Sequence, residues 1–240
     1  MRLPAVERKK KLARRRSCKK KTFSILMPTS HVYLSYIARA SSLYPRKEWN
    51  VWDFGIAADS SINACFWLSV VAGLSRMAEH YASSDKVLSA FLQDAQALKE
   101  VSLETLRVES RPVAGNDLLG KLARRVRILV CGENGYMLQK ENVCRWAPAF
   151  AYLQQEHDFS ASFSDYVHWV HRVADCEYAD ELVLSATAEM LKVELSVLPY
   201  TPPGAKSQWA VWNSQNSQQL ELESNRILLG NDDVHYVLLF

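Results

Sequence analysis

The sequence predicts an α+β domain in which helices pack on a small C-terminal β-sheet. Segments with apolar residues at helical spacing follow one another up to about residue 192. Short β-branched or alternating runs, separated by turn signals, occupy the remainder. Helices followed by strands are typical of α+β folds. With 240 residues, 48% of them hydrophobic and 23% charged, the chain has enough apolar material for one substantial core.

The first predicted helix is the run CFWLSVVAGLSRMAEHYA at 65–82, which carries large residues almost all round, as a buried helix does. Ser84 can cap a second helix, whose apolar positions are 87, 88, 91, 92, 95 and 98. A third begins near 116–117 and sets an apolar stripe against an Arg-rich face. Further helical patterns cover 142–155, 162–174 and 180–192.

The predicted strands are ELSVL, WAVWN, QQLELE, RILL and HYVLLF, with turn signals such as PPG and GNDD between them. These strands come together late in the chain, and the sequence has no internal repeat. We therefore expect a single folded domain over 50–240. A basic tail over 1–22 and an N-terminal extension over 23–49 precede it.

The charge of the chain is unevenly distributed. Residues 1–21 hold eleven Lys or Arg against Glu7, so the formal net charge of +3 leaves about −7 for the rest. A segment this charged is expected to be disordered by itself. Its basic clusters are typical of nuclear localisation signals or of segments that attract nucleic acid, and equally of a solubilising tail. No aromatic residue lies between these charges, so base stacking is not expected there.

The chain has five cysteines without a C-x-x-C pair, an odd number that argues against a secreted disulfide scaffold. The first apolar stretch, FSILM, ends at Pro28 and is too short for a signal peptide or a membrane span. We expect a cytoplasmic or nuclear protein with free thiols and no membrane partner.

Cys65 follows the polar, small-residue loop DSSINA and begins the first predicted helix. Asn63 is a candidate N-cap, which would place Cys65 in the first helical turn. The helix dipole and the unpaired N–H groups of that turn favour a thiolate and can bind an oxyanion. A buried, inert cysteine would give the same pattern.

His235 stands between an acidic turn and the apolar C-terminal strand, in GNDDVHYVLLF. Alone, it reads most simply as the first residue of a strand. A cysteine at a helix start and a histidine at a strand start are nonetheless the two halves of a thiol-protease dyad, which meet only in space.

Three segments in the same order resemble the ovarian-tumour (OTU) family of cysteine peptidases. SINACFWLSVVAGL resembles the family's nucleophile block, usually Asp-Gly-Asn-Cys followed by a small-residue helix. Residues 163–198 resemble its central block, with Tyr178 where the family usually has Trp and Ala179 where it has Gly. HYVLL resembles the block that carries the base histidine. The resemblance covers roughly 50–240 and implies an OTU-like, papain-type α+β fold.

The resemblance also implies an activity, a thiol-dependent deubiquitinase that hydrolyses the (iso)peptide bond at the C-terminus of ubiquitin or a ubiquitin-like modifier. Cys65 would attack the carbonyl carbon. His235 would take the thiol proton and later protonate the leaving amine. The oxyanion would rest on the Cys65 N–H and on donors from the 60–64 loop.

The residue that would orient His235 is left open by the sequence. Ile62-Asn63-Ala64-Cys65 lacks the family's Asp, and Val237 occupies the position two after the histidine, where the family often has Asp or Asn. The remaining candidates are Asp59 first, then Asn231, Asp232 and Asp233, a backbone carbonyl, or a bare dyad. A catalytically inactive ubiquitin-binding module, targeted by the basic tail, is the alternative function.

Other chemistry finds little support in the sequence. His168 and His171 are spaced i, i+3 near Asp175 and Cys176, but a fourth metal ligand at a recognised spacing is missing. Walker, G-x-G-x-x-G and G-x-S-x-G motifs are absent from the sequence. We therefore expect no metal and no cofactor.

Overall fold

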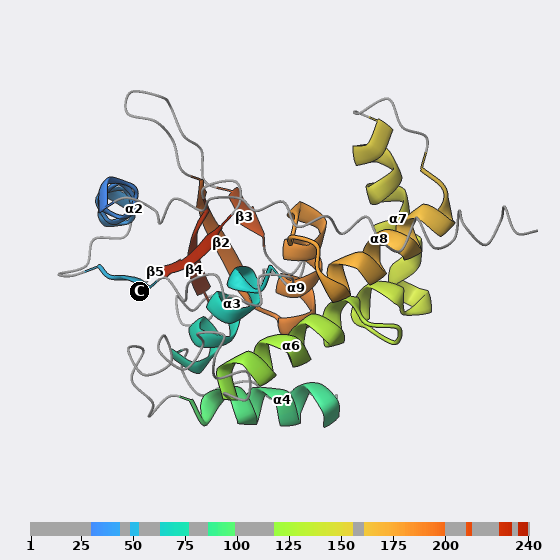
Figure 1. Cartoon of the computed structure of the whole chain (residues 1–240), viewed down its shortest axis with the longest axis horizontal. Coiled ribbons are helices and arrows are strands. Elements are labelled where there is room, and N and C mark those ends of the chain that lie inside the picture. Colours follow the sequence, from blue (N-terminus) through green and yellow to red (C-terminus); the bar gives the residue numbers. More distant parts are fainter. Residues whose placement is uncertain are drawn as a thin grey trace, which may run out of the picture.

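The computed structural model (Figure 1) describes residues 30–43, 49–52, 63–76, 86–98, 118–155, 161–199, 210–212, 226–231 and 235–239. Its helices are α2 (Ser30–Leu43), α3 (Cys65–Arg76), α4 (Lys86–Gln96), α6 (Leu118–Cys131), α7 (Lys140–Gln155), α8 (Phe163–Asp175) and α9 (Glu181–Leu191). A short 3-10 helix, η3 (Tyr136–Leu138), connects α6 to α7.

Five strands form one mixed sheet in the order β1-β5-β4-β2-β3. They are β1 (Val51–Trp52), β2 (Glu194–Pro199), β3 (Ala210–Trp212), β4 (Arg226–Asn231) and β5 (Tyr236–Leu239). β2 and β4 run parallel, and every other neighbouring pair is antiparallel. The last strand of the chain therefore lies inside the sheet, between β4 and β1.

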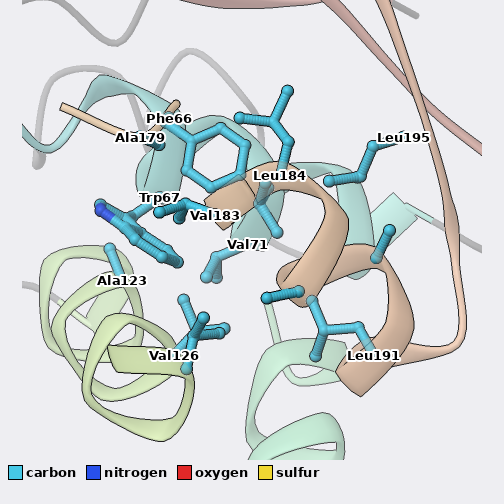
Figure 2. Close-up of a cluster of buried hydrophobic side chains, with 14 of the residues drawn as sticks. Phe66, Trp67, Val71, Ala123, Val126, Ala179, Val183, Leu184, Leu191 and Leu195 are labelled. Atoms are coloured by element: carbon cyan, nitrogen blue, oxygen red, sulfur yellow. The ribbon is translucent and has the colours of Figure 1, made fainter. Parts of the chain in front are cut away.

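The two faces of the sheet are covered unequally. On one face, α3 packs against β4 and β5, and α4, α6, α8 and α9 pack around α3 and one another in a large core (Figure 1). On the other face, α2 closes a smaller cluster made of Tyr36, Ala40, Trp49, Leu198, Leu228, Val237 and Leu239. Figure 2 shows the part of the large core where α3, α6 and α9 meet.

α3 is the central helix, as its sequence predicts. Eleven of its twelve residues are buried, from Cys65 to Ser75. Gly73 lets the helix approach the sheet closely, since a Cβ at this position would lie 2.7 Å from Ile227 and 3.3 Å from Leu238. The backbone of α3 at Gly73 thus lies close against β4 and β5.

The structure confirms the predicted α+β class, with helices packed on a small sheet. The predicted helices appear as α3, α4, α6, α7, α8 and α9, and four of the five predicted strands appear as β2 to β5. The QQLELE run and the tail over 1–22 lie outside the described residues. The sequence did not reveal α2, which lies within the predicted N-terminal extension, or the two-residue β1.

Two expectations about helix faces were wrong. Val87 was assigned to the apolar face of α4, but its side chain is 55% exposed. The sequence set an Arg-rich face of α6 against its apolar stripe, but Arg127, one of the arginines of this run, is only 2% exposed. Its position continues the apolar stripe of α6 one turn after Ala123, so helical geometry places it inside the core.

No helix within the described residues is long and apolar enough to span a membrane.

Candidate active site

Cys65 is the first residue of α3, as predicted, but its helix begins differently from the expectation. The Leu68 N–H donates to the Ala64 carbonyl at 2.9 Å, so Ala64, and not Asn63, precedes the first helical residue. The methyl group of Ala64 cannot accept a hydrogen bond, so this position offers no side-chain cap to the first-turn N–H groups. Cys65 itself is 6% exposed.

Asn63 turns the chain into α3 through an uncommon backbone conformation. Its φ is 45°, in the left-handed region that Gly and Asn tolerate best. In the resemblance described above, Asn63 stands at the family's Gly, which fits this backbone. Its side-chain amide donates to the Cys176 carbonyl at 2.5 Å and so ties the segment before Cys65 to the end of α8.

His235 lies immediately before β5 and is 5% exposed. Phe66 and Tyr236, which follow Cys65 and His235 in the sequence, are in contact. The rings of Phe66 and Tyr236 lie edge to face, with centroids 5.2 Å apart. The helix that starts with Cys65 and the strand that follows His235 therefore begin side by side, although Phe66 and Tyr236 are 170 positions apart in the sequence.

Of the candidates for orienting His235, only Asn231 is described. It is the last residue of β4 and pairs with Tyr236 across the antiparallel ladder, so the two side chains share a face of the sheet. The Asn231 amide oxygen is buried and has no hydrogen-bond partner within the described part of the chain. Asp59, Asp232 and Asp233 lie outside the described residues.

Val237 belongs to the opposite face of the sheet. It is 2% exposed and packs with Tyr36 and Trp49 in the small cluster under α2. An aliphatic core side chain thus fills the place where the resembled family often carries an acceptor for its histidine.

The other described cysteines lie in different surroundings. Cys131 is fully buried in α6, and burial strongly raises the pKa of its thiol, which stays protonated near neutral pH. Cys144 is exposed on α7, with its sulfur 3.8 Å from the Lys140 carbonyl. None of the four cysteines that the structure describes is in a disulfide.

His168 and His171 do not form a metal centre with their neighbours. His168 is exposed on α8, where a ring nitrogen lies 2.7 Å from the Ser164 carbonyl. Among the residues described, no group of three or more His, Cys, Asp or Glu side chains is arranged to hold a metal ion.

Arg127 is the polar residue near this site that sequence reasoning misplaced. Its guanidinium donates to two backbone carbonyls at the end of α8, those of Val173 and Glu177. It also lies 5.9 Å from the ring of Trp67, two residues after Cys65. The spacing of the α6 apolar stripe, which includes position 127, is the signal that predicts its burial.

No protein-family model matches the sequence, and no curated protein sequence matches it. Among solved structures, the chain is similar to a chain of the complex described as h/ceOTUB1–ubiquitin aldehyde–UBC13~Ub. The two chains are 12% identical over 75% of this chain and 74% of that chain, with a TM-score of 0.47. A likeness of this size supports no conclusion about activity or partners, which are therefore inferred from the residues.

Proposed function

We propose that the chain is a thiol-dependent deubiquitinase. It would hydrolyse the (iso)peptide bond at the C-terminus of ubiquitin or a ubiquitin-like modifier. The observation that carries the proposal is the contact of Phe66 with Tyr236, because it places the α3 start beside the β5 start. The three sequence segments that resemble OTU peptidases supply the substrate class.

In the proposed reaction, the Cys65 thiol gives its proton to His235 and its sulfur attacks the carbonyl carbon of the scissile bond. The N–H groups of the first turn of α3 are directed at the developing oxyanion, and Ala64 leaves them without a side-chain acceptor at the cap position. His235 then protonates the departing amine, and a thioester forms on Cys65. Water, activated by His235, hydrolyses this thioester and releases the free thiol.

The orientation of His235 needs an acceptor for its second ring nitrogen. Asp59 is the first candidate, since it is a carboxylate in the loop before Cys65. Asn231 is the second, supported by its buried amide oxygen without a partner in the described part of the chain.

A second function has one observation in its favour. Val237 fills with an aliphatic side chain the place that often holds the family's acceptor, as expected in an inactive module that binds ubiquitin without cleaving it.

Hydrolysis of a ubiquitin C-terminal fluorogenic amide separates the two functions. We expect turnover by the wild-type chain, none by Cys65→Ala, and a loss of at least about 1000-fold in His235→Gln, because both steps need the base. Binding of ubiquitin by a folded wild-type chain without turnover would establish the inactive module instead.

A further inference from the structure

Arg127 is a buried charge that the proposed reaction does not use. It is 2% exposed and has the buried residues Ala123, Val126 and Val130 as neighbours on α6. Burial lowers the pKa of Arg127, against which the nearby Cys131, Cys176, Asp175 and Cys65 raise it. A guanidinium keeps its charge in proteins, and a buried charge is costly unless its donors are satisfied.

Two donors of Arg127 bind carbonyls in one stretch of backbone. Nε donates to the Val173 carbonyl at 2.5 Å, and a terminal nitrogen donates to the Glu177 carbonyl at 2.9 Å. The last carbonyls of a helix have no partner within the helix and lie at the negative end of its dipole. Arg127 therefore closes the C-terminal end of α8 from a neighbouring helix.

The same turn accepts a hydrogen bond from each side of the proposed dyad. Asn63, two residues before Cys65, donates to the Cys176 carbonyl at 2.5 Å. Tyr236, the residue after His235, donates its hydroxyl to the Ala179 carbonyl at 3.2 Å. Segments from α3 and β5 thus meet on backbone between Val173 and Ala179, which we name the clamp turn.

The structure assigns to the clamp turn, held by the buried Arg127, the role of setting the spacing between Cys65 and His235. Arg127, Asn63 and Tyr236 are then positioning residues, which act through backbone and touch neither the substrate nor the reacting sulfur. This role rests on the proposed function.

Tyr236→Phe tests the base side of the clamp turn, because it removes one hydroxyl and keeps the ring against Phe66. Tyr166→Phe is its matched control, since the Tyr166 hydroxyl is also buried and donates to a backbone carbonyl, that of Met137, at 2.7 Å. Each variant loses one buried hydrogen bond, so we expect similar small decreases in Tm. Only Tyr236→Phe should lower kcat, by about 5-fold, with KM unchanged within about twofold.

Asn63→Gly tests the nucleophile side, because Gly keeps the left-handed backbone and removes the donor to Cys176. Asn142→Ala is its control, since the Asn142 amide donates to the Tyr136 carbonyl at 2.9 Å, away from the dyad. Arg127→Lys keeps the charge but cannot span two carbonyls as a guanidinium does. We expect kcat to fall about 5-fold in Asn63→Gly and about 10- to 100-fold in Arg127→Lys. If Arg127→Lys does not fold, the kcat values of Asn63→Gly and Tyr236→Phe decide whether the clamp turn has the proposed role.

The rate at which iodoacetamide alkylates Cys65 reports on the same site without a ubiquitin substrate. We expect Cys65 to react about 5-fold more slowly in Asn63→Gly and Tyr236→Phe than in the controls, while the exposed Cys144 reacts equally in all. Wild-type kcat and Cys65 alkylation rates in both variants would overturn the clamp turn. A wild-type chain that hydrolyses no ubiquitin substrate would overturn the proposed function instead, and the alkylation rates would then decide the positioning role.

Discussion

The two faces of the sheet differ in what they contribute. The face under α3 carries a core drawn from six helices, which includes Cys65 at the start of α3 and Tyr236 at the start of β5. The face under α2 holds a cluster of seven buried residues, among them Tyr36 and Val237. β5 belongs to both, because Tyr236 and Leu238 pack in the large core while Val237 and Leu239 pack in the small one. The position two after His235 therefore serves packing on the face away from α3.

Removal of α2 should have the largest effect on stability. A chain that begins at Trp49 loses Tyr36 and Ala40, and it exposes Leu228, Val237 and Leu239. We expect a loss of about 3–5 kcal/mol in the free energy of unfolding, the usual cost of emptying a buried aromatic site. Denaturant titration measures it. A chain that begins at Thr22 is the control and should keep both stability and rate, and a large loss there would show that the basic tail is structural.

Removal of the Asp59 carboxylate should reduce turnover with little change in stability. We expect Asp59→Ala to lower kcat by about 10- to 1000-fold, equivalent to about 1.4–4 kcal/mol of barrier. The dyad and the oxyanion donors remain, so the effect stays below that of Cys65→Ala. Asn231→Ala is the matched comparison. Full activity of Asp59→Ala, with a loss in Asn231→Ala, would give the orienting role to the amide at the end of β4.

Adding a methyl group at a glycine under each helix compares how tightly the two faces of the sheet are packed. Gly73→Ala places a Cβ 2.7 Å from Ile227 beneath α3, and Gly230→Ala places one 2.8 Å from both Tyr36 and Val237 beneath α2. Overpacking of this kind costs about 1–3 kcal/mol. In Gly73→Ala, up to about 1 kcal/mol is offset by the better helix propensity of Ala. Thermal unfolding should therefore show the larger decrease for Gly230→Ala.

Removing the side chain nearest to each added methyl group tests whether that contact causes the loss of stability. Gly230→Ala should cost less in the chain that begins at Trp49, because Tyr36 is then absent. Gly73→Ala combined with Ile227→Ala should cost less than the sum of the single changes. Strict additivity in both cases would contradict the close approaches.

The smallest expected effect is a gain. Ala64→Asn gives α3 a side chain that can accept from its first-turn N–H groups, worth about 1 kcal/mol. For a domain of this size, that corresponds to a rise of about 2–4 °C in Tm. Ala64→Ser, whose hydroxyl can accept from the same N–H groups, should give a similar gain. An unchanged Tm in Ala64→Asn would mean that these N–H groups already have partners.

Some elements of the two faces could be predicted from the sequence and others could not. α3 is apolar almost all round and α8 has strong apolar periodicity, so their existence was predictable, and Cys65 at a helix start followed from the polar loop before it. β1 has only two residues, and its pairing with β5 joins residue 51 to residue 239, which no local pattern encodes.

Arg127 and Asn63 were misplaced for a related reason. An arginine is usually exposed, and the carbonyls of Val173 and Glu177, far along the sequence, help to make its burial tolerable. An Asn before a helix usually caps it, whereas here the left-handed backbone of Asn63 turns its amide toward Cys176. Both side chains are placed by tertiary partners that cannot be read from their own neighbourhoods.

The most direct test of the proposed activity is covalent capture of Cys65. The full chain is incubated with ubiquitin that carries a C-terminal electrophile, and the adduct is located by peptide mass spectrometry. We expect one ubiquitin per chain, attached to Cys65, with no adduct in Cys65→Ala and a strongly slowed reaction in His235→Gln. A folded wild-type chain that forms no adduct, or forms it on Cys131, Cys144 or Cys176, would contradict the assignment of Cys65 and His235 as a catalytic pair.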